Sequence, residues 1–315
     1  MLRLRLPWRA PRMEAGPIVL GVRRLYILPT RLGMLYAALL FGLFIGSLNY
    51  GISLGYLFTF LLASLGTVSL IHTQRNLAGL VLSAAAVRPV YAGEPAVFPL
   101  RVENLNARPR YALTLHGAGD SSPPLDIAGR DSGELRLVLP QTRRGYHRPG
   151  RLVLASTWPL GLFRGWTVFQ LDWGALVYPR PAADALPLPA GGGEGGGGGA
   201  ARVEEAEFAG LREYHPGDPL RRIAWKAVAR SQGLLSKTFA GERGGGVWLD
   251  WEAAPERETE ARLSRLARWA LDAEAAGQDW GMTLPGRRLQ SGRGEAHLRQ
   301  ALEYLARHGT RTETT

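Results

Sequence analysis

The residues best able to do chemistry lie in one dense polar block near residue 220. The block combines cationic side chains with a histidine, a tyrosine, an aspartate and a turn: Arg212, Tyr214, His215, Pro216, Gly217, Asp218, Arg221, Arg222, Trp225, Lys226 and Arg230. Asp218 can accept the free amides at a helix start, and Pro219 fits the first helical position, where no amide donor is lost. We therefore expect a helix that begins at Pro219.

The basic residues of this expected helix form a strip. Arg222, Lys226 and Arg230 recur every four residues and so share one face. Together with the basic side chains near the positive end of the helix, the strip can bind an acidic partner or a phosphate. The alternative is that the strip is simply solvated.

An acid/base interpretation of the same block is also open. Asp218, Glu213 and His215 are residue types that can transfer protons. The structural alternative is that Glu213 and Asp218 only tie the turn together with Arg212. The chain has no cysteine, no His-Glu-x-x-His zinc motif and no Gly-x-Ser-x-Gly nucleophile turn. We therefore expect no enzyme activity, no cofactor and no metal.

Glycine dominates the segment that precedes the block. Residues 182–201 are rich in Gly and Pro, which is typical of a flexible linker or loop. A phosphate-binding loop would end in Gly-Lys followed by Ser or Thr, but Ala200-Ala201 follow the glycines. The composition therefore argues against a nucleotide site.

The elements that would position this block begin with a membrane anchor. Two apolar stretches, Leu32–Leu48 and Ile52–Ile71, are joined by three residues and contain no charge. About 20 apolar residues span a bilayer, and a helix satisfies its own backbone there. A buried helical hairpin or a cleaved signal peptide would suit the first stretch alone. Two adjacent stretches favour a transmembrane hairpin.

The charges around the hairpin predict its orientation. Seven arginines precede it against one acid, Glu14, and Arg75 follows it; the seven are Arg3, Arg5, Arg9, Arg12, Arg23, Arg24 and Arg31. Arginine at both outer ends places both on the cytoplasmic side. This explains over half of the formal net charge of +11, so we expect contact with the lipid bilayer and none with nucleic acid.

After the hairpin, apolar and polar residues alternate in short segments typical of strands, and a mixed pattern of strands and helices follows near the end of the chain. Seven short strands are expected near Leu80–Val90, Ala96–Glu103, Tyr111–His116, Glu134–Leu139, Arg151–Ser156, Thr167–Leu171 and Ala175–Tyr178. They suit an all-β immunoglobulin-like sandwich. A reduced α/β order follows: strand Val247–Asp250, helix Glu256–Ala276, strand Trp280–Leu284 and helix Glu295–Arg307.

The polar block carries a family resemblance. It resembles the signature of the domain of unknown function 58 family, R-x-Y-x-P-G-D-x-x-R-x-I-x-W-K-x-x-A-R. Further segments look like the same family: Gln74-Arg75-Asn76-Leu77, Arg144-Gly145-Tyr146, Trp158-Pro159-Leu160-Gly161-Leu162-Phe163 and Val177-Tyr178-Pro179.

The resemblance implies a membrane protein encoded beside a MoxR-type AAA+ ATPase and often beside a membrane transglutaminase-like protein. Larger relatives end in a von Willebrand factor A-like domain, whose D-x-S-x-S loop binds a divalent metal. Here Asp250 is followed by Trp251-Glu252-Ala253-Ala254, so both serines are missing. Magnesium prefers several oxygen ligands, and the resemblance therefore implies a degenerate, metal-free remnant.

These observations predict a multi-domain membrane protein. Its expected parts are a basic cytoplasmic N-terminus (1–31), a two-helix transmembrane hairpin (32–72), a β-sandwich (78–181), a linker (182–201) and the block with a reduced α/β domain (202–315). We expect a non-enzymatic scaffold of the bacterial inner membrane that docks a MoxR-type ATPase or its client in the cytoplasm through protein–protein interaction. The alternative is an enzyme or regulator associated with an envelope polymer, in a peptidoglycan or transglutaminase pathway.

Overall fold

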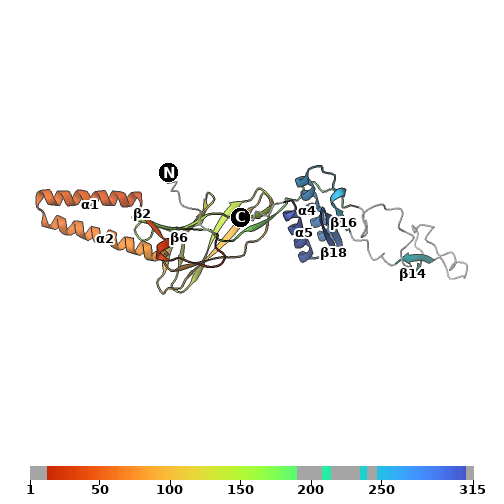
Figure 1. Cartoon of the computed structure of the whole chain (residues 1–315), viewed down its shortest axis with the longest axis horizontal. Coiled ribbons are helices and arrows are strands. Elements are labelled where there is room, and N and C mark those ends of the chain that lie inside the picture. The colour runs from red at the N-terminus through yellow and green to blue at the C-terminus, as the bar shows by residue number, and fades with distance from the viewer. Residues whose placement is uncertain (1–12, 190–207, 214–234, 240–246, 310–315) are drawn as a thin grey trace. The chain divides into compact units, whose positions relative to one another are not determined.

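The computed structural model describes residues 13–189, 208–213, 235–239 and 247–309 (Figure 1). The chain divides into two compact units, Met1–Tyr178 and Pro179–Thr310. Each unit is described by itself. Unit 1 contains the helical hairpin together with a β-rich domain, and unit 2 contains a small α/β fold.

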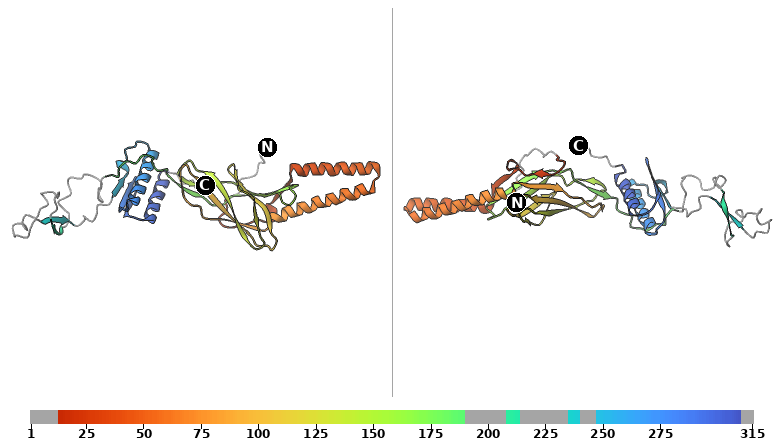
Figure 2. Two further views of the ribbon diagram at one scale, coloured as in Figure 1. Left: turned by 180° about the vertical axis from the view of Figure 1, so that it is seen from behind. Right: turned by 90° about the horizontal axis from the view of Figure 1, so that it is seen from below.

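Two long helices form the hairpin of unit 1. Helix α1 (Arg31–Tyr50) is capped by Thr30, and it ends at Gly51, which has a left-handed backbone. Helix α2 (Ser53–Leu77) runs back beside α1 (Figure 2). Both helices are long and apolar enough to cross a membrane, so the two predicted transmembrane stretches are present as candidate spans, which supports a membrane association.

The second helix differs from the prediction at its end. The apolar run stops at Ile71, yet α2 continues to Leu77. Its last turn is buried within unit 1, where Thr73, Asn76 and Leu77 are almost inaccessible. Packing against the β domain, rather than hydropathy, therefore determines where α2 ends.

Two antiparallel sheets form the core of the β domain. One sheet has the order β1 (Ile18–Val19), β3 (Leu80–Ala84), β5 (Pro95–Asn104) and β9 (Ser132–Pro140). The other has the order β2 (Tyr26–Pro29), β12 (Phe163–Phe169), β11 (Leu152–Ser156), β6 (Arg110–Gly117) and β7 (Asp120–Ser121), with β8 (Leu125–Ile127) beside β6. Inward residues of both sheets, such as Phe98, Leu100, Leu115 and Leu154, share one buried core.

A small third sheet lies in the same unit. It joins β10 (Gly145–His147), β13 (Ala175–Tyr178) and β4 (Val90–Tyr91). Two segments that carried the family resemblance meet here, because Gly145 is the register partner of Val177.

The N-terminal segment contributes to both main sheets, which the sequence did not predict. Strand β1 pairs with β3 and strand β2 pairs with β12, with the short 3-10 helix Val22–Arg24 between them. The described part of the expected basic N-terminus is therefore an integral part of the β domain. Two further strands differ from expectation: the run Leu80–Val90 divides into β3 and β4, and β12 starts at Phe163 instead of Thr167. The intervening Pro89 cannot donate to a ladder.

Unit 2 has an α/β core. Strand β16 (Val247–Asp250) pairs in parallel with β17 (Trp280–Leu284), and β18 (Arg287–Gly292) pairs antiparallel with β17. Helices α4 (Thr259–Ala275) and α5 (Glu295–Arg307) pack together and against this sheet (Figure 2). The predicted bounds of β16, β17 and α5 are confirmed, whereas β18 was not predicted. Helix α4 starts three residues later than expected, after Glu258 at its N-cap.

Candidate functional site

The predicted polar block falls almost wholly outside the described residues. Arg212 lies on β14 (Phe208–Glu213), which pairs antiparallel with β15 (Leu235–Phe239). Outside the described ranges lie Tyr214, His215, Pro216, Gly217, Asp218, Arg221, Arg222, Trp225, Lys226 and Arg230. Because Glu213 and Leu235 are register partners, the chain leaves β14 and enters β15 at neighbouring positions. The basic strip and the helix from Pro219 stay predictions.

The most developed polar site among the described residues joins the hairpin to the β domain. We call this site the anchor junction, and it comprises Thr30, Thr73, Asn76, Tyr111, Ser156 and the loop 157–162. Thr30 is the N-cap of α1, and threonine suits this position because its hydroxyl can accept a hydrogen bond from a free backbone N–H at the start of a helix. Gly33 N donates to Thr30 Oγ1 at 3.1 Å, and Thr30 N donates to Leu162 O at 2.9 Å. The start of α1 is thereby fixed to the loop.

The end of α2 is fixed to the same region by neutral hydrogen bonds. Thr73 Oγ1 lies 2.9 Å from Trp158 O. Asn76 Nδ2 donates to Tyr111 O at 2.8 Å and to Ser156 Oγ at 2.9 Å, while Asn76 Oδ1 accepts from Tyr111 N at 2.9 Å. The Asn76 amide is 3 % exposed and uses both its donors and its acceptor. A buried amide satisfied in this way holds one geometry, since any shift leaves a polar group without a partner.

Two glycines allow the helices to come close to the β domain. A Cβ atom on Gly33 would lie 2.0 Å from Leu162 O, and one on Gly165 would lie 3.0 Å from Leu77 Cδ1. No ordinary side chain fits at the first distance without movement of the backbone. The junction therefore depends on glycine as well as on hydrogen bonds.

Aromatic rings complete the anchor junction. Trp158 stacks on Tyr111 with ring centroids 4.9 Å apart, and His72 meets Trp158 edge-on at 5.7 Å. These rings come from β6, from the loop after β11 and from the end of α2. Beyond them, the hairpin presents large apolar side chains such as Leu35, Phe41 and Leu54 to its surroundings. A surface of this kind requires lipid or protein to cover it.

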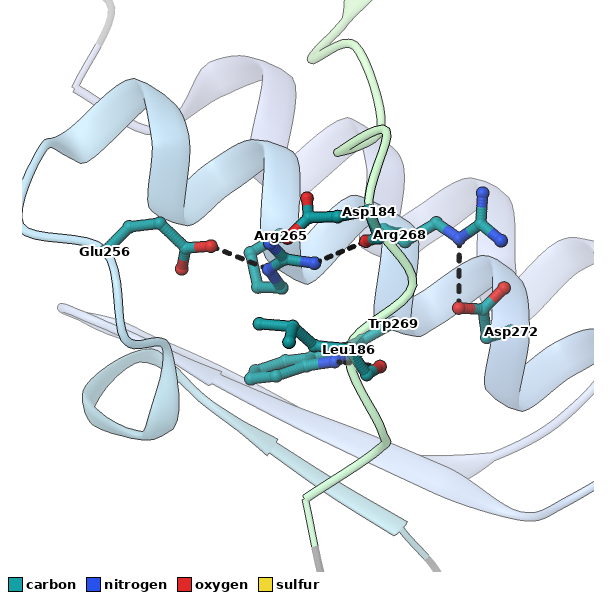
Figure 3. A network of polar contacts seen from close by, with 7 residues as sticks. All are labelled: Asp184, Leu186, Glu256, Arg265, Arg268, Trp269 and Asp272. Carbon is teal, nitrogen blue, oxygen red and sulfur yellow. Dashed lines mark hydrogen bonds and ion pairs between the residues drawn. The ribbon is translucent and has the colours of Figure 1, made fainter.

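Unit 2 contains a charged site of a different kind, centred on Arg265 of α4 (Figure 3). We call Arg265, Asp184 and Glu256 the arginine cluster. Arg265 is 3 % exposed; its Nε donates to Glu256 Oε1 at 2.7 Å and its Nη2 donates to Asp184 Oδ2 at 2.6 Å. Trp269 Nε1 also donates to Leu186 O at 3.2 Å. The first residues of the expected linker are therefore held against α4, contrary to the composition-based prediction.

The charges within the arginine cluster stabilise one another. The hydrogen bond from Arg265 is the main cause that lowers the pKa of Asp184. Burial lowers the pKa of Arg265, but the hydrogen bonds to Glu256 and Asp184 outweigh burial and leave that pKa raised. Both shifts favour the charged forms of Asp184 and Arg265 at neutral pH. A fully paired arginine of this kind serves packing and offers no free group for catalysis.

Asp250 occupies the end of β16, where the resembled family's larger members place a metal loop. Its Oδ1 accepts from Glu252 N at 3.1 Å and so caps the 3-10 helix Trp251–Ala253. Glu252 is highly exposed and lies 3.8 Å from Arg262. In the described part of the chain, no group of three His, Cys, Asp or Glu residues is arranged to hold a metal ion. Asp250 has a structural use here.

A shallow basic depression lies on the β domain between β6, β7, β11 and β12. His116, Arg151 and Arg164 line it, together with Asp120, whose Oδ2 accepts from Val138 N at 3.1 Å. Burial, followed by the charge of Arg164, lowers the pKa of His116. The depression is open and its carboxylate is engaged by the backbone, so these residues do not form a catalytic set.

Comparisons with known proteins add little. No family model matches the chain, and no curated protein matches it. Two solved structures of a GH20 exo-β-N-acetylglucosaminidase from Vibrio harveyi show weak similarity. An inactive mutant is 12 % identical over 36 % of this chain with a TM-score of 0.19, and a complex with N-acetylglucosamine is 11 % identical over 43 % with the same TM-score. This chain spans 20 % and 23 % of their lengths. Similarity at this level supports no argument about fold or activity.

Proposed function

We propose that this protein is a non-enzymatic scaffold of the bacterial inner membrane. A transmembrane hairpin would hold an immunoglobulin-like sandwich and a reduced von Willebrand factor A-like fold at the cytoplasmic surface. The observation that carries the proposal is the anchor junction, which builds both ends of the hairpin into one β domain.

The strand order supports a hairpin that crosses the membrane and returns. Strand β2 precedes α1, and it pairs with β12, which follows α2. The hairpin therefore begins and ends at the same domain, because α1 starts there and α2 finishes there. Exposed Arg31 and Arg75 lie at these two ends. Positive residues at both ends favour the cytoplasmic side for the whole domain.

The proposed partner is a MoxR-type AAA+ ATPase, with a membrane transglutaminase-like protein as a further candidate. The support is the resemblance of the block from Arg212 to Arg230, together with the basic strip expected there. The use of Asp250 as a helix cap favours a metal-free role for unit 2. An adaptor needs a rigid attachment to the membrane and an accessible docking segment, and the anchor junction provides the rigid attachment.

Binding to the ATPase tests this proposal. We would reconstitute the full chain in lipid nanodiscs and measure capture of the neighbouring MoxR-type ATPase with and without ATP. Substitution of Arg222, Lys226 and Arg230 by Gln should abolish capture. A matched control replaces three exposed arginines of the β domain, Arg88, Arg143 and Arg151, and should leave capture unchanged. Full binding by the folded strip variant would contradict docking through the strip.

Topology separates the scaffold from the envelope-polymer alternative. A reporter fused after Thr315 should be active in the cytoplasm and silent in the periplasm. Periplasmic activity would reject the cytoplasmic scaffold and would direct attention to Asp218, Glu213 and His215 as an acid/base group.

A further inference from the structure

We infer that the loop 157–162, between β11 and β12, lies in the membrane interface as a third lipid-contacting element beside the two helices. This inference rests on the proposed transmembrane hairpin. It assigns the loop to a lipid partner, the head-group and upper acyl region of the inner leaflet.

The hydrogen bonds of the anchor junction set the depth of the loop. Thr73, which contacts Trp158 O, lies 20 residues along α2 from its start at Ser53. At 1.5 Å per residue this is about 30 Å, the thickness of the hydrocarbon core. Thr30, which binds Leu162 O, immediately precedes the 20 residues of α1. Both contacts thus place the loop at the boundary of the core.

The composition of the loop suits that depth. Trp158-Pro159-Leu160-Gly161-Leu162 contains no charge, and Leu160 is 45 % exposed within unit 1. Trp158 and Tyr111 are the amphipathic aromatic types enriched at membrane interfaces. Exposed Arg31 is the first residue of α1, and exposed Arg75 lies in the last turn of α2, so both lie at the depth of the loop and can contact lipid phosphates.

Continuity with the helices favours lipid over a protein as the occupant of this surface. The loop is attached to the start of α1 through Leu162 and to the last turns of α2 through Trp158. Leu160 lies between these two attachments in the sequence. A bilayer that surrounds both helices therefore reaches the loop without any movement of unit 1.

The absence of cysteine from the chain makes a direct test possible. We would introduce single cysteines, Leu160→Cys, Leu39→Cys in the middle of α1 and Val97→Cys on β5, and label each with an environment-sensitive fluorophore. Leu39 is 56 % exposed and Val97 is 41 % exposed, so all three sites are open to labelling. Val97 lies seven residues along β5 from Asn104, the partner of Leu80, or about 23 Å from the hairpin end of the domain.

The labelled proteins would be reconstituted in phosphatidylethanolamine and phosphatidylglycerol vesicles with lipids brominated at shallow or deep acyl positions. We expect several-fold stronger quenching at residue 160 than at residue 97, with shallow bromines more effective than deep ones. Residue 39 should respond most to deep bromines. Quenching at residue 39 but not at residue 160 would overturn the loop inference alone. No quenching at residue 39 would overturn the hairpin itself.

Discussion

Each unit attaches a helix to another part of its fold, and the two attachments differ in the charge of the groups that form them. In unit 1, the neutral amide of Asn76 and the hydroxyls of Thr73 and Ser156 fix α2 to the β domain. In unit 2, the buried guanidinium of Arg265 fixes the segment after Pro179 to α4 through two carboxylates. The hydrogen bonds of the first site join neutral groups, whereas those of the second join a guanidinium to two carboxyl groups.

The difference follows from where each site would operate. Charges placed near a bilayer core are costly, while neutral hydrogen bonds keep their partners there without a solvation penalty for ions. In a domain surrounded by water, the desolvation cost of a buried guanidinium can be offset by carboxylates that pair with it. The neutral hydrogen bonds around Asn76 should therefore respond little to pH and salt, whereas the ion pairs of unit 2 should respond to both.

The largest expected effect comes from removal of the buried charge. Arg265→Met keeps much of the side-chain volume but leaves Glu256 and Asp184 without their cation. The Asp184 side chain is 67 % exposed and is solvated when the cation is lost, whereas the Glu256 side chain is only 20 % exposed. A shielded hydrogen-bonding group left without its partner costs about 1–3 kcal/mol, and more when it is charged. Hydrogen exchange, followed by mass spectrometry in detergent micelles, should show this loss of protection in α4 and in residues 182–189.

Arg268→Met is the matched control on the same helix. Arg268 contacts Asp272 at 3.0 Å, and both side chains are about one-third exposed. A pair of this kind is worth about 0–1 kcal/mol. Equal effects of the two substitutions would show that the arginine cluster has no special role.

Removal of the neutral attachment should cost less. Asn76→Leu leaves the part-buried Tyr111 N–H without its acceptor, and an orphaned group of this type costs up to about 1–3 kcal/mol. Protection should fall in β6, β11 and the last turn of α2. Asn106→Leu, at an exposed position of the same domain, should have little effect. A silent Asn76 variant would contradict the role assigned to the anchor junction.

Close packing of α1 gives the next effect. In Gly33→Ala, the new methyl group collides with the Leu162 carbonyl, and overpacking of this kind costs about 1–3 kcal/mol. Gly42→Ala is the control, because nothing lies within 4 Å of a Cβ atom there, and it should be neutral or slightly stabilising. Thermal unfolding of the two variants in the same detergent measures the difference.

Acid should have the smallest effect, and it should act on the attachment in unit 2. The pKa of Asp184 is lowered in the folded protein, so its contribution is complete above the ordinary aspartate pKa of about 3.9 and is lost as pH falls through the lower folded value. Hydrogen exchange corrected for intrinsic rates should show this loss in α4 and not around Asn76. Arg265→Met should abolish the pH dependence.

The acid response of His116 must be separated from that of Asp184, because the pKa of His116 is lowered as well. Its lowered pKa means that stability from the neutral ring is complete above about 6.5 and declines as pH falls through the folded value. This response belongs to β6 and precedes that of Asp184. His116→Gln should remove this response from β6, so that the acid responses of α4 and of the segments around Asn76 can be compared directly.

Local patterns predicted the regular elements well. The hairpin follows from apolar runs, and β16, β17 and α5 follow from short alternating or amphipathic segments with clear ends. The helix expected at Glu256–Ala276 buries Leu263, Leu266, Ala270 and Ala273, whose spacing places them on one face of α4. Strands β1 and β2 were missed because they have two and four residues, too few for a periodic signal.

The anchor junction could not be derived from local patterns. Asn76 meets Tyr111 and Ser156, which lie 35 and 80 residues away, and no periodicity predicts such pairings. A signal did exist in the resemblance, since two of its quoted segments contain Asn76 and Trp158. Arg265 was missed as well, although a cation beside the apolar positions of an amphipathic helix was visible in the sequence.

The pairing of β2 with β12 also constrains the order of events during synthesis. The strand that ends at Pro29 cannot pair until Phe163 is synthesised, about 130 residues later. At about 5–20 residues per second, this delay is of the order of ten seconds. Both apolar helices are complete long before then. In the proposed topology, insertion of the hairpin into the bilayer precedes closure of the six-stranded sheet, and the newly made edge strand has to stay unpaired in the interval.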